Sequence, residues 1–492
     1  MKESSVITKE ASVTTKNISK VFLLRVLAQY PFLVLFVMLI PRMMGPEIYG
    51  EYALLISIVA IMTSLTNLGV MEICGRFVPE FEVRGESADI KRFSSNLLTL
   101  KIAIDLITSI ILLSVLHLAY GDRFPFTYFI LVVAIPLVSD VGTVPYALLF
   151  GLNKLGKFSL RDPVNSALIL ISIFILFHYY GLFGAILSTL LVEGFVAMLY
   201  FFWTRKYFRT EDFRVDLSFL KPYLRFGFMF YMSWGLLSIC QSLGNPLIGY
   251  ITKDLQEVAL FDIPNQIFLV MANFTLFIMI SLVPIFTRLL LTGKEETLIN
   301  WSRLIIKYIG IRCTIIFWAF ILAGRDLIPI VIGSNYRGIF PNGVVLLLGM
   351  FPIIFAQLGF VFSVVYKEPE KYFQALCFAF VAFLVGSILF IPRYASMGCA
   401  IATLISCIVL AVVICVYFRE KLFPCLAYGF KVIALGVIFV PFLFVRGNLI
   451  TNLLLTVCSV LTYILLLFVS RVLSLREIKG IFQAIRHQPE EL

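Results

Sequence analysis

The sequence predicts an all-α integral membrane protein with about 14 transmembrane helices, arranged as two six-helix pseudo-repeats followed by two further helices. Three observations lead to this fold class. Hydrophobic residues make up 60% of the chain and the mean hydropathy is +0.98. The apolar stretches are roughly 20 residues long, which suits a helix that crosses a bilayer. They are continuously apolar, without the alternation of a transmembrane β-strand.

The predicted spans follow one another with short gaps on one side of the membrane and slightly longer gaps on the other. In chain order they are 19–41, 50–75, 94–118, 126–150, 160–180, 183–204, 222–250, 256–287, 304–323, 341–365, 372–392, 395–418, 426–445 and 449–470.

Most of the 40 Lys and Arg residues lie in alternate gaps and in the two tails. Positive charge marks the cytoplasmic side of a membrane protein, so both termini are expected in the cytoplasm. The net charge of +11 is then explained by short loops beside anionic headgroups rather than by nucleic acid. The polar N-terminus has no signal-peptide pattern, and the first span is expected to remain as an anchor in the plasma or inner membrane.

Several short matches recur at a nearly constant separation along the chain. Val78-Pro79-Glu80-Phe81 matches Val283-Pro284-Ile285-Phe286, and Lys157-Phe158 matches Lys371-Tyr372. They predict a parallel repeat with a substrate path between its halves. The expected organisation is a polar N-terminus (1–18), an N-lobe (19–205), a cytoplasmic linker (206–221), a C-lobe (222–420), two appended helices (421–470) and a cytoplasmic tail (471–492).

The sequence indicates neither a nucleotide site nor a metal site. Residues 151–158 come near to a phosphate-binding loop, but Phe158 replaces the hydroxyl residue and an apolar helix precedes the motif. The nine cysteines have no metal-ligand spacing and are interpreted as small apolar residues. We therefore expect no cofactor and no metal.

Ionisable residues deep inside the spans are the main functional candidates, because a charge in the bilayer must face a cavity or a partner. Arg312 lies ~13 Å into its span and Arg25 ~9 Å. The cation candidates for a substrate cavity are Arg25, Lys101 and Arg312, and the candidates for ion coupling are Asp105, Asp140, Glu193 and Asp262. Internal pairing is the alternative, and it is suggested by the spacing of Lys101 with Asp105 and of Glu72 with Arg76. Pro264, beside Asp262, is expected to interrupt its helix.

The opening of the chain resembles that of polysaccharide-biosynthesis flippases, the O-antigen-flippase-like branch of the multidrug/oligosaccharidyl-lipid/polysaccharide exporter superfamily. The residues that carry this resemblance are Pro41-Arg42, Gly45-Pro46-Glu47, Tyr49-Gly50, Asn67-Leu68-Gly69 and Arg76 with Pro79-Glu80. Leu220 to Gly227 and Phe286-Thr287-Arg288 are also similar to that family.

The resemblance implies two lobes in a V, a central cationic cavity and alternating access. The cargo would be a lipid-linked, polyprenyl-pyrophosphate oligosaccharide, moved from the inner to the outer leaflet. Arg25 and Arg312 would meet the pyrophosphate, while Arg42, Gly45, Arg76 and Pro264 would serve turns or gating. Enzymes of the same glycan pathway, such as a polymerase or glycosyltransferases, are possible partners, and the protein itself would not be an enzyme.

Two other functions are considered. A cation-coupled multidrug antiporter would share the fold and would use the carboxylates, but the opening motif and the two appended helices argue against it. A membrane glycan polymerase or glycosyltransferase would need a sizeable outer loop with acid/base residues. The longest outer gap, 325–340, carries only Arg325, Asp326 and Arg337 as charged residues.

Overall fold

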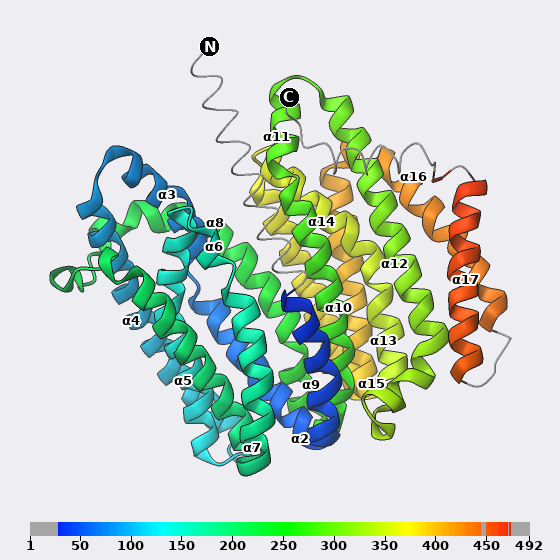
Figure 1. The fold of residues 1–492 in the computed structure, drawn as a ribbon, viewed down its shortest axis with the longest axis horizontal. Coiled ribbons are helices and arrows are strands. Elements are labelled where there is room, and N and C mark those ends of the chain that lie inside the picture. Colours follow the sequence, from blue (N-terminus) through cyan, green and yellow to red (C-terminus); the bar gives the residue numbers. More distant parts are fainter. Residues whose placement is uncertain (1–27, 444–448, 471, 474–492) are drawn as a thin grey trace. The chain divides into compact units, whose positions relative to one another are not determined.

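The computed structural model describes residues 28–443, 449–470 and 472–473. All regular elements in this part of the chain are helices (Figure 1). Ten helical stretches among these residues are long and apolar enough to cross a membrane. In lipid, helices satisfy their own backbone polar groups, and this is why uninterrupted apolar runs of this length fold as helices. The predicted all-α membrane fold is therefore confirmed at this level.

The chain divides into two compact units, and the boundaries fall within α10 (Leu255–Ser281) and α15 (Pro369–Tyr417). Unit 1 contains residues 28–263 with 387–399, and unit 2 contains the remaining described residues. The elements of unit 1 are α2 (Tyr30–Thr66), α3 (Val70–Arg84), α4 (Ser87–Tyr120), α5 (Phe126–Gly151), α6 (Leu155–Phe158), α7 (Arg161–Thr204), η2 (Arg205–Tyr207), η3 (Thr210–Asp212), α8 (Leu217–Ser242), α9 (Gly244–Thr252) and the start of α10.

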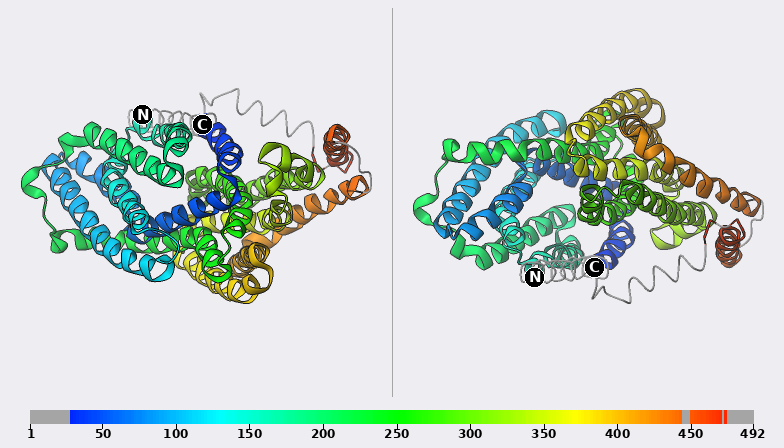
Figure 2. Two further views of the ribbon diagram at one scale, coloured as in Figure 1. Left: turned by 90° about the horizontal axis from the view of Figure 1, so that it is seen from below. Right: turned by 90° about the horizontal axis from the view of Figure 1, so that it is seen from above.

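Unit 2 begins within α10 (Leu255–Ser281). It continues with α11 (Val283–Leu291), α12 (Glu295–Val331), η4 (Ser334–Tyr336), α13 (Ile339–Leu348), α14 (Met350–Val365), most of α15 (Pro369–Tyr417), α16 (Arg419–Leu435), η5 (Gly436–Leu443) and α17 (Leu449–Val469). Figure 2 shows the helices nearly end-on, and within this unit α12 contacts both α13 and α14.

Three long helices each contain one residue with non-helical backbone angles, so each consists of two helical halves. These residues are Gly45 in α2, Gly181 in α7 and Ala395 in α15. Gly45 has φ +77° and Gly181 has φ +56°, a region that glycine enters without steric cost. All three interruptions fall in, or at the edge of, gaps that the sequence predicted between spans.

Other boundaries differ from the prediction because a short turn carries little signal in hydropathy. The predicted span 50–75 is divided at Leu68 and Gly69, which both have positive φ, between α2 and α3. The predicted span 222–250 is divided at Leu243 into α8 and α9. The predicted span 256–287 is divided at Leu282 into α10 and α11.

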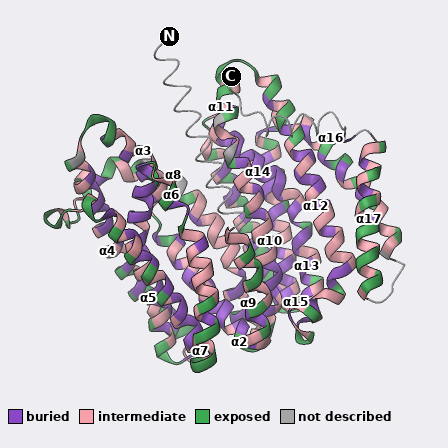
Figure 3. Ribbon diagram, viewed as in Figure 1, coloured by how far each residue is buried: buried purple, intermediate pink, exposed green. Residues whose placement is uncertain are grey.

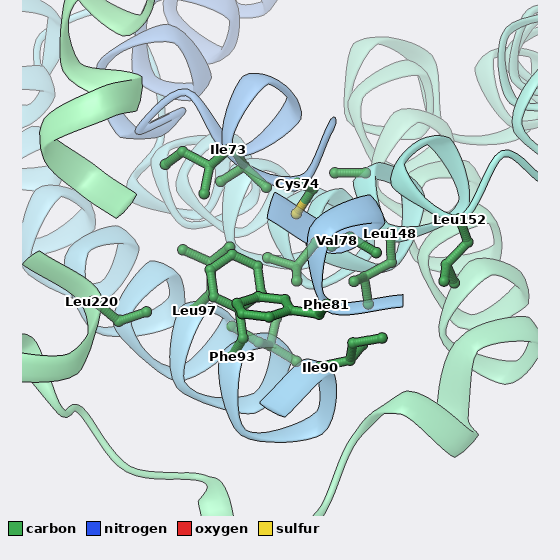
Figure 4. Close-up of a cluster of buried hydrophobic side chains, with 14 of the residues drawn as sticks. Ile73, Cys74, Val78, Phe81, Ile90, Phe93, Leu97, Leu148, Leu152 and Leu220 are labelled. Carbon is green, nitrogen blue, oxygen red and sulfur yellow. The ribbon is translucent and has the colours of Figure 1, made fainter. Parts of the chain in front are cut away.

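The core of unit 1 forms where α3, α4 and α5 meet the beginning of α8. Ile73, Cys74, Val78, Phe81 and Phe93 belong to a buried apolar cluster that also takes in Leu220 (Figure 4). Exposed apolar side chains lie further along α4, from Leu106 to Leu118, and along α17 of unit 2 (Figure 3). Such faces suit contact with lipid tails rather than water.

The linker 206–221 is fastened to α4 by hydrogen bonds. Ser95 Oγ accepts from the Arg209 N–H at 3.0 Å, and Asn96 Nδ2 donates to the Asp212 carbonyl at 3.2 Å. Asn96 Oδ1 accepts from the Asp216 N–H at 3.0 Å, and Arg92 pairs with the Asp216 carboxylate at 3.1 Å. The linker is therefore attached to the end of unit 1.

Candidate functional site

A cluster of three charged residues lies inside unit 1, where α2, α4 and α5 meet. Lys101 and Asp105 come from α4 and Asp140 from α5, and at most 4% of each residue is exposed. Lys101 Nζ donates to Asp105 Oδ1 at 3.3 Å and to Asp140 Oδ2 at 2.5 Å. One ammonium group thus faces two carboxylates in a region from which water is excluded.

Hydroxyl groups complete the shell of Asp140 but not that of Asp105. Thr66 of α2 donates to Asp140 Oδ2 at 3.0 Å, and Thr143 donates to Asp140 Oδ1 at 3.1 Å. Asp105 Oδ2 is buried and has no hydrogen-bond partner among the described residues. The two carboxylates therefore have different environments.

Lys101, which the sequence predicts to be a cavity cation, lies in this buried cluster. The pairing with Asp105 was the alternative interpretation, and it is confirmed. The other suggested pair, Glu72 with Arg76, is not the ion pair that forms: Arg76 Nε pairs with Glu80 at 3.2 Å. Spacing along a helix identifies the residues that lie on one face. Packing then decides whether a side chain pairs with the residue one turn before it or one turn after it.

Glu193 lies in a second polar group of unit 1, between α5 and the two halves of α7. Asn165 donates to Glu193 Oε1 at 2.8 Å, and Ser139 donates to Oε2 at 3.0 Å. Arg161 lies 3.9 Å from Glu193 Oε2 and also stacks over the ring of Tyr146. Glu193 thus has one cationic partner and two neutral donors.

Asp262 is buried in unit 1, where it joins α10 to α2 and α9. Tyr49 donates its hydroxyl to Asp262 Oδ2 at 2.8 Å, and Asn245 donates to Oδ1 at 2.6 Å. Asn245 also donates to Ser57 Oγ at 2.7 Å. The sequence does not indicate Tyr49 and Asn245 as partners of Asp262, because neutral donors on distant helices produce no charge pattern.

Arg312 lies in unit 2, near the middle of α12. Its Nη2 group donates to Thr275 Oγ1 and, at 3.2 Å, to the Met271 carbonyl, both on α10. The guanidinium also lies over the ring of Phe274, 5.1 Å from its centroid. Its Nε and Nη1 groups are buried without a hydrogen-bond partner, and no carboxylate pairs with it among the described residues. Thr275 was not predicted.

The remaining candidates are distributed over the chain. Arg25 lies outside the described residues. Arg42 is exposed and adjoins the turn at Gly45, while Pro264 is buried within α10, which continues as a helix through it. The division of the chain into units falls between Ile263 and Pro264. No group of His, Cys, Asp or Glu side chains that could hold a metal occurs in the described part of the chain.

Among the described residues outside the membrane helices, Asp216 has a carboxyl group that several hydrogen bonds hold in its charged form. Its Oδ1 accepts from Ser218 Oγ at 2.6 Å and from the Phe219 N–H at 3.1 Å, and it thereby caps α8. These hydrogen bonds, together with the nearby Arg92, lower the pKa of Asp216 to about 2. The linker is thus attached to α4 through a carboxylate that stays charged in moderately acidic solution.

Solved structures with a similar fold include membrane flippases and transporters. The "Lipid II flippase MurJ, inward closed conformation" has a TM-score of 0.66 at 14% identity, with 93% of this chain and 99% of that chain covered. An inward-facing multidrug resistance MATE family transporter has a TM-score of 0.58 at 18% identity, covering 77% and 92%. A MOP superfamily transporter from Pyrococcus furiosus has a TM-score of 0.51 at 17% identity, covering 84% and 95%. At these identities the likeness establishes the fold.

The comparison with curated proteins finds no match. A family model described as "Polysaccharide biosynthesis protein" matches residues 15–290, which is more than half of the chain. The chain belongs to the polysaccharide biosynthesis protein family.

Proposed function

We propose that the protein is a flippase that moves a lipid-linked, polyprenyl-pyrophosphate oligosaccharide from the inner to the outer leaflet of the plasma or inner membrane. Membership of the polysaccharide biosynthesis family supports the glycan pathway, and the shared fold with a lipid II flippase supports the type of movement. The oligosaccharide would pass through the protein while the polyprenyl tail stays in lipid. Enzymes that build or polymerise the glycan are the proposed partners.

The main observation behind the proposal is that Arg312 has no carboxylate partner among the described residues. A guanidinium group can hold two phosphate oxygens at once, through parallel N–H groups. Arg312 is already oriented by Thr275, Met271 and Phe274, and two of its donor groups remain unpartnered. A half-buried cation inside a membrane helix that has no carboxylate partner is unfavourable unless an anion reaches it during function. A pyrophosphate would supply that anion.

We also propose the finer architecture that the sequence predicted. The chain would have 14 spans, in two six-helix repeats with two appended helices, and both termini would lie in the cytoplasm. The halves of α2, α7 and α15 on either side of Gly45, Gly181 and Ala395 would count as separate spans. Arg25 would join Arg312 as a cavity cation, and Asp105, Asp140, Glu193 and Asp262 would provide groups for ion coupling.

The test is reconstitution into vesicles with a fluorescent lipid-linked oligosaccharide, whose arrival in the opposite leaflet is followed by quenching. We expect the wild-type protein to move the label and Arg312→Ala to slow it at least tenfold. Arg312→Lys keeps the charge without the planar group and should fall between the two. Arg325→Ala is the matched control, since Arg325 lies on the same helix and is exposed.

The same preparation distinguishes a flippase from a multidrug antiporter. The antiporter is the second candidate function because the fold is similar to that of a MATE family transporter. Extrusion of small cationic dyes against a Na⁺ or H⁺ gradient, without movement of the oligosaccharide, would overturn the flippase proposal. Equal rates for wild type and Arg312→Ala would remove Arg312 from the proposed cavity.

A further inference from the structure

The charges of the cluster in unit 1 do not balance. Lys101 brings one positive charge, while Asp105 and Asp140 bring two negative charges if both are ionised. All three side chains are buried near the middle of α4 and α5. By helical rise Asp105 lies ~27 Å from the beginning of α4 and ~22 Å from its end. An uncompensated charge at such a depth costs several kcal/mol, so the cluster needs one further positive charge.

The two carboxylates are not equivalent as places for that charge. Asp140 accepts hydrogen bonds from Lys101, Thr66 and Thr143, and the donors satisfy both of its oxygens as an ionised group. Asp105 receives only the longer bond from Lys101, on Oδ1, and its buried Oδ2 has no partner. One helical turn further along α4, the buried Ser109 hydroxyl also lacks a partner. An acceptor atom and a hydroxyl group are thus left unsatisfied on one face of α4.

A metal ion does not fit this place. The Lys101 ammonium already lies within hydrogen-bond distance of both carboxylates, and a second cation there would face it at short range. A proton adds the missing charge without occupying additional volume. Bound to Oδ2, it turns the orphan acceptor into an O–H donor, and the buried cluster becomes neutral.

We propose that Lys101, Asp105 and Asp140 form a single-proton site, with the proton held on Asp105. Uptake of one proton from water forms the Asp105 O–H bond, and release restores the carboxylate, so each cycle carries one positive charge. The charged groups that face Asp105 are Lys101 on its own helix and Asp140 on α5, while α2 contributes the Thr66 hydroxyl. The role of this proton as the coupling ion of transport depends on the proposed flippase function. The presence of the proton on Asp105 does not depend on it.

Infrared spectroscopy of the full-length protein in detergent tests the site without any transport. At neutral pH the wild-type spectrum should contain a carboxylic-acid C=O band that Asp105→Asn removes. Asp140→Asn should also remove it, because Asp105 then becomes the single ionised partner of Lys101. Glu193→Gln is the matched control and should leave the band unchanged, since Glu193 already faces one cation, Arg161.

Thermal stability separates a proton site from a merely structural ion-pair network. Asp105→Asn leaves Lys101 balanced by Asp140, so it should melt no lower than the wild type, whereas a network that needs both ionised carboxylates would lose stability.

In the infrared experiment, a carboxylic-acid C=O band of undiminished size in Asp105→Asn overturns the proposal.

A transport measurement then separates this inference from the proposed function. In vesicles, an imposed pH gradient should change the rate of oligosaccharide movement by the wild type, and Asp105→Asn should no longer respond. An undiminished response in that variant overturns the coupling role. If the infrared band behaves as expected and no oligosaccharide moves, the proton site stands and the flippase function fails.

Discussion

Replacing Gly50 with alanine should destabilise unit 1, because α2 approaches the backbone of α10 at this residue. A Cβ atom on Gly50 would lie 1.8 Å from the carbonyl oxygen of Leu255 and 2.7 Å from its carbonyl carbon. Ordinary contacts between such atoms are about 3.5 Å, so the two helices would have to separate by more than 1 Å, roughly. The obstacle is backbone, and no side-chain rotation can relieve it.

The same separation would weaken the hydrogen bond that Tyr49 donates to Asp262, since it joins the same two helices at 2.8 Å. Overpacking of this kind costs about 1–3 kcal/mol, and the loss of a hydrogen bond to a charged group adds about 1.5–3 kcal/mol. We therefore expect Gly50→Ala to lower the free energy of unfolding by about 4 kcal/mol, from the sum of these two contributions.

The assay is thermal unfolding of the purified protein in detergent, followed by intrinsic fluorescence. Gly156→Ala is the control, since a Cβ atom at Gly156 would meet no atom within 4 Å. We expect a clearly lower melting temperature for Gly50→Ala and little change for the control. Equal melting temperatures in the two variants would refute the reasoning.

Three further predictions concern other parts of the molecule. Gly359→Ala would place a Cβ atom 2.0 Å from Ile414 Cγ2, so it should lower the melting temperature. Adding Ile414→Ala should restore part of the loss, because the obstacle is a side chain. A double variant that melts at the same temperature as Gly359→Ala contradicts this. Lys101→Met leaves the buried carboxylate of Asp140 without its cation and should destabilise the protein by about 3–5 kcal/mol, measured by the same thermal assay. Wild-type stability of this variant would show that Lys101 contributes little. The lowered pKa of Asp216 means that its ionised form contributes stability above its ordinary value near 4, and this contribution is lost as pH falls through about 2. Hydrogen exchange of the linker, corrected for the intrinsic rate, should therefore be unchanged between neutral pH and about pH 4, and Asp216→Asn should raise it at both.

The sequence predicted the features that depend on residues within a single helix. Apolar runs identified the membrane helices, and the interruptions at Gly45, Gly181 and Ala395 coincide with, or border, predicted gaps. The pairing of Lys101 with Asp105 followed from their spacing of one helical turn. These features are local, so they need no knowledge of which helices are neighbours.

Features that depend on contacts between helices could not be predicted. Asp140 was recognised as a deep carboxylate, but its approach to Lys101 from α5 depends on how α4 and α5 pack. Thr275 and Tyr49 are ordinary residues in the sequence, and they gain their roles only through Arg312 and Asp262. The division at Leu68 and Gly69 was also missed, because two residues of positive φ do not change the hydropathy of the segment.

The unpaired guanidinium of Arg312 has a further consequence, which concerns exclusion. A cationic molecule that approached within 6 Å would be repelled by about 3 kcal/mol at an effective dielectric constant of roughly 20. That repulsion corresponds to more than a hundredfold discrimination, roughly. Positively charged amphiphiles would thus be turned away from α12 even where their size and apolar surface suited it. Selectivity for an anion would come as much from this rejection as from any contact with phosphate.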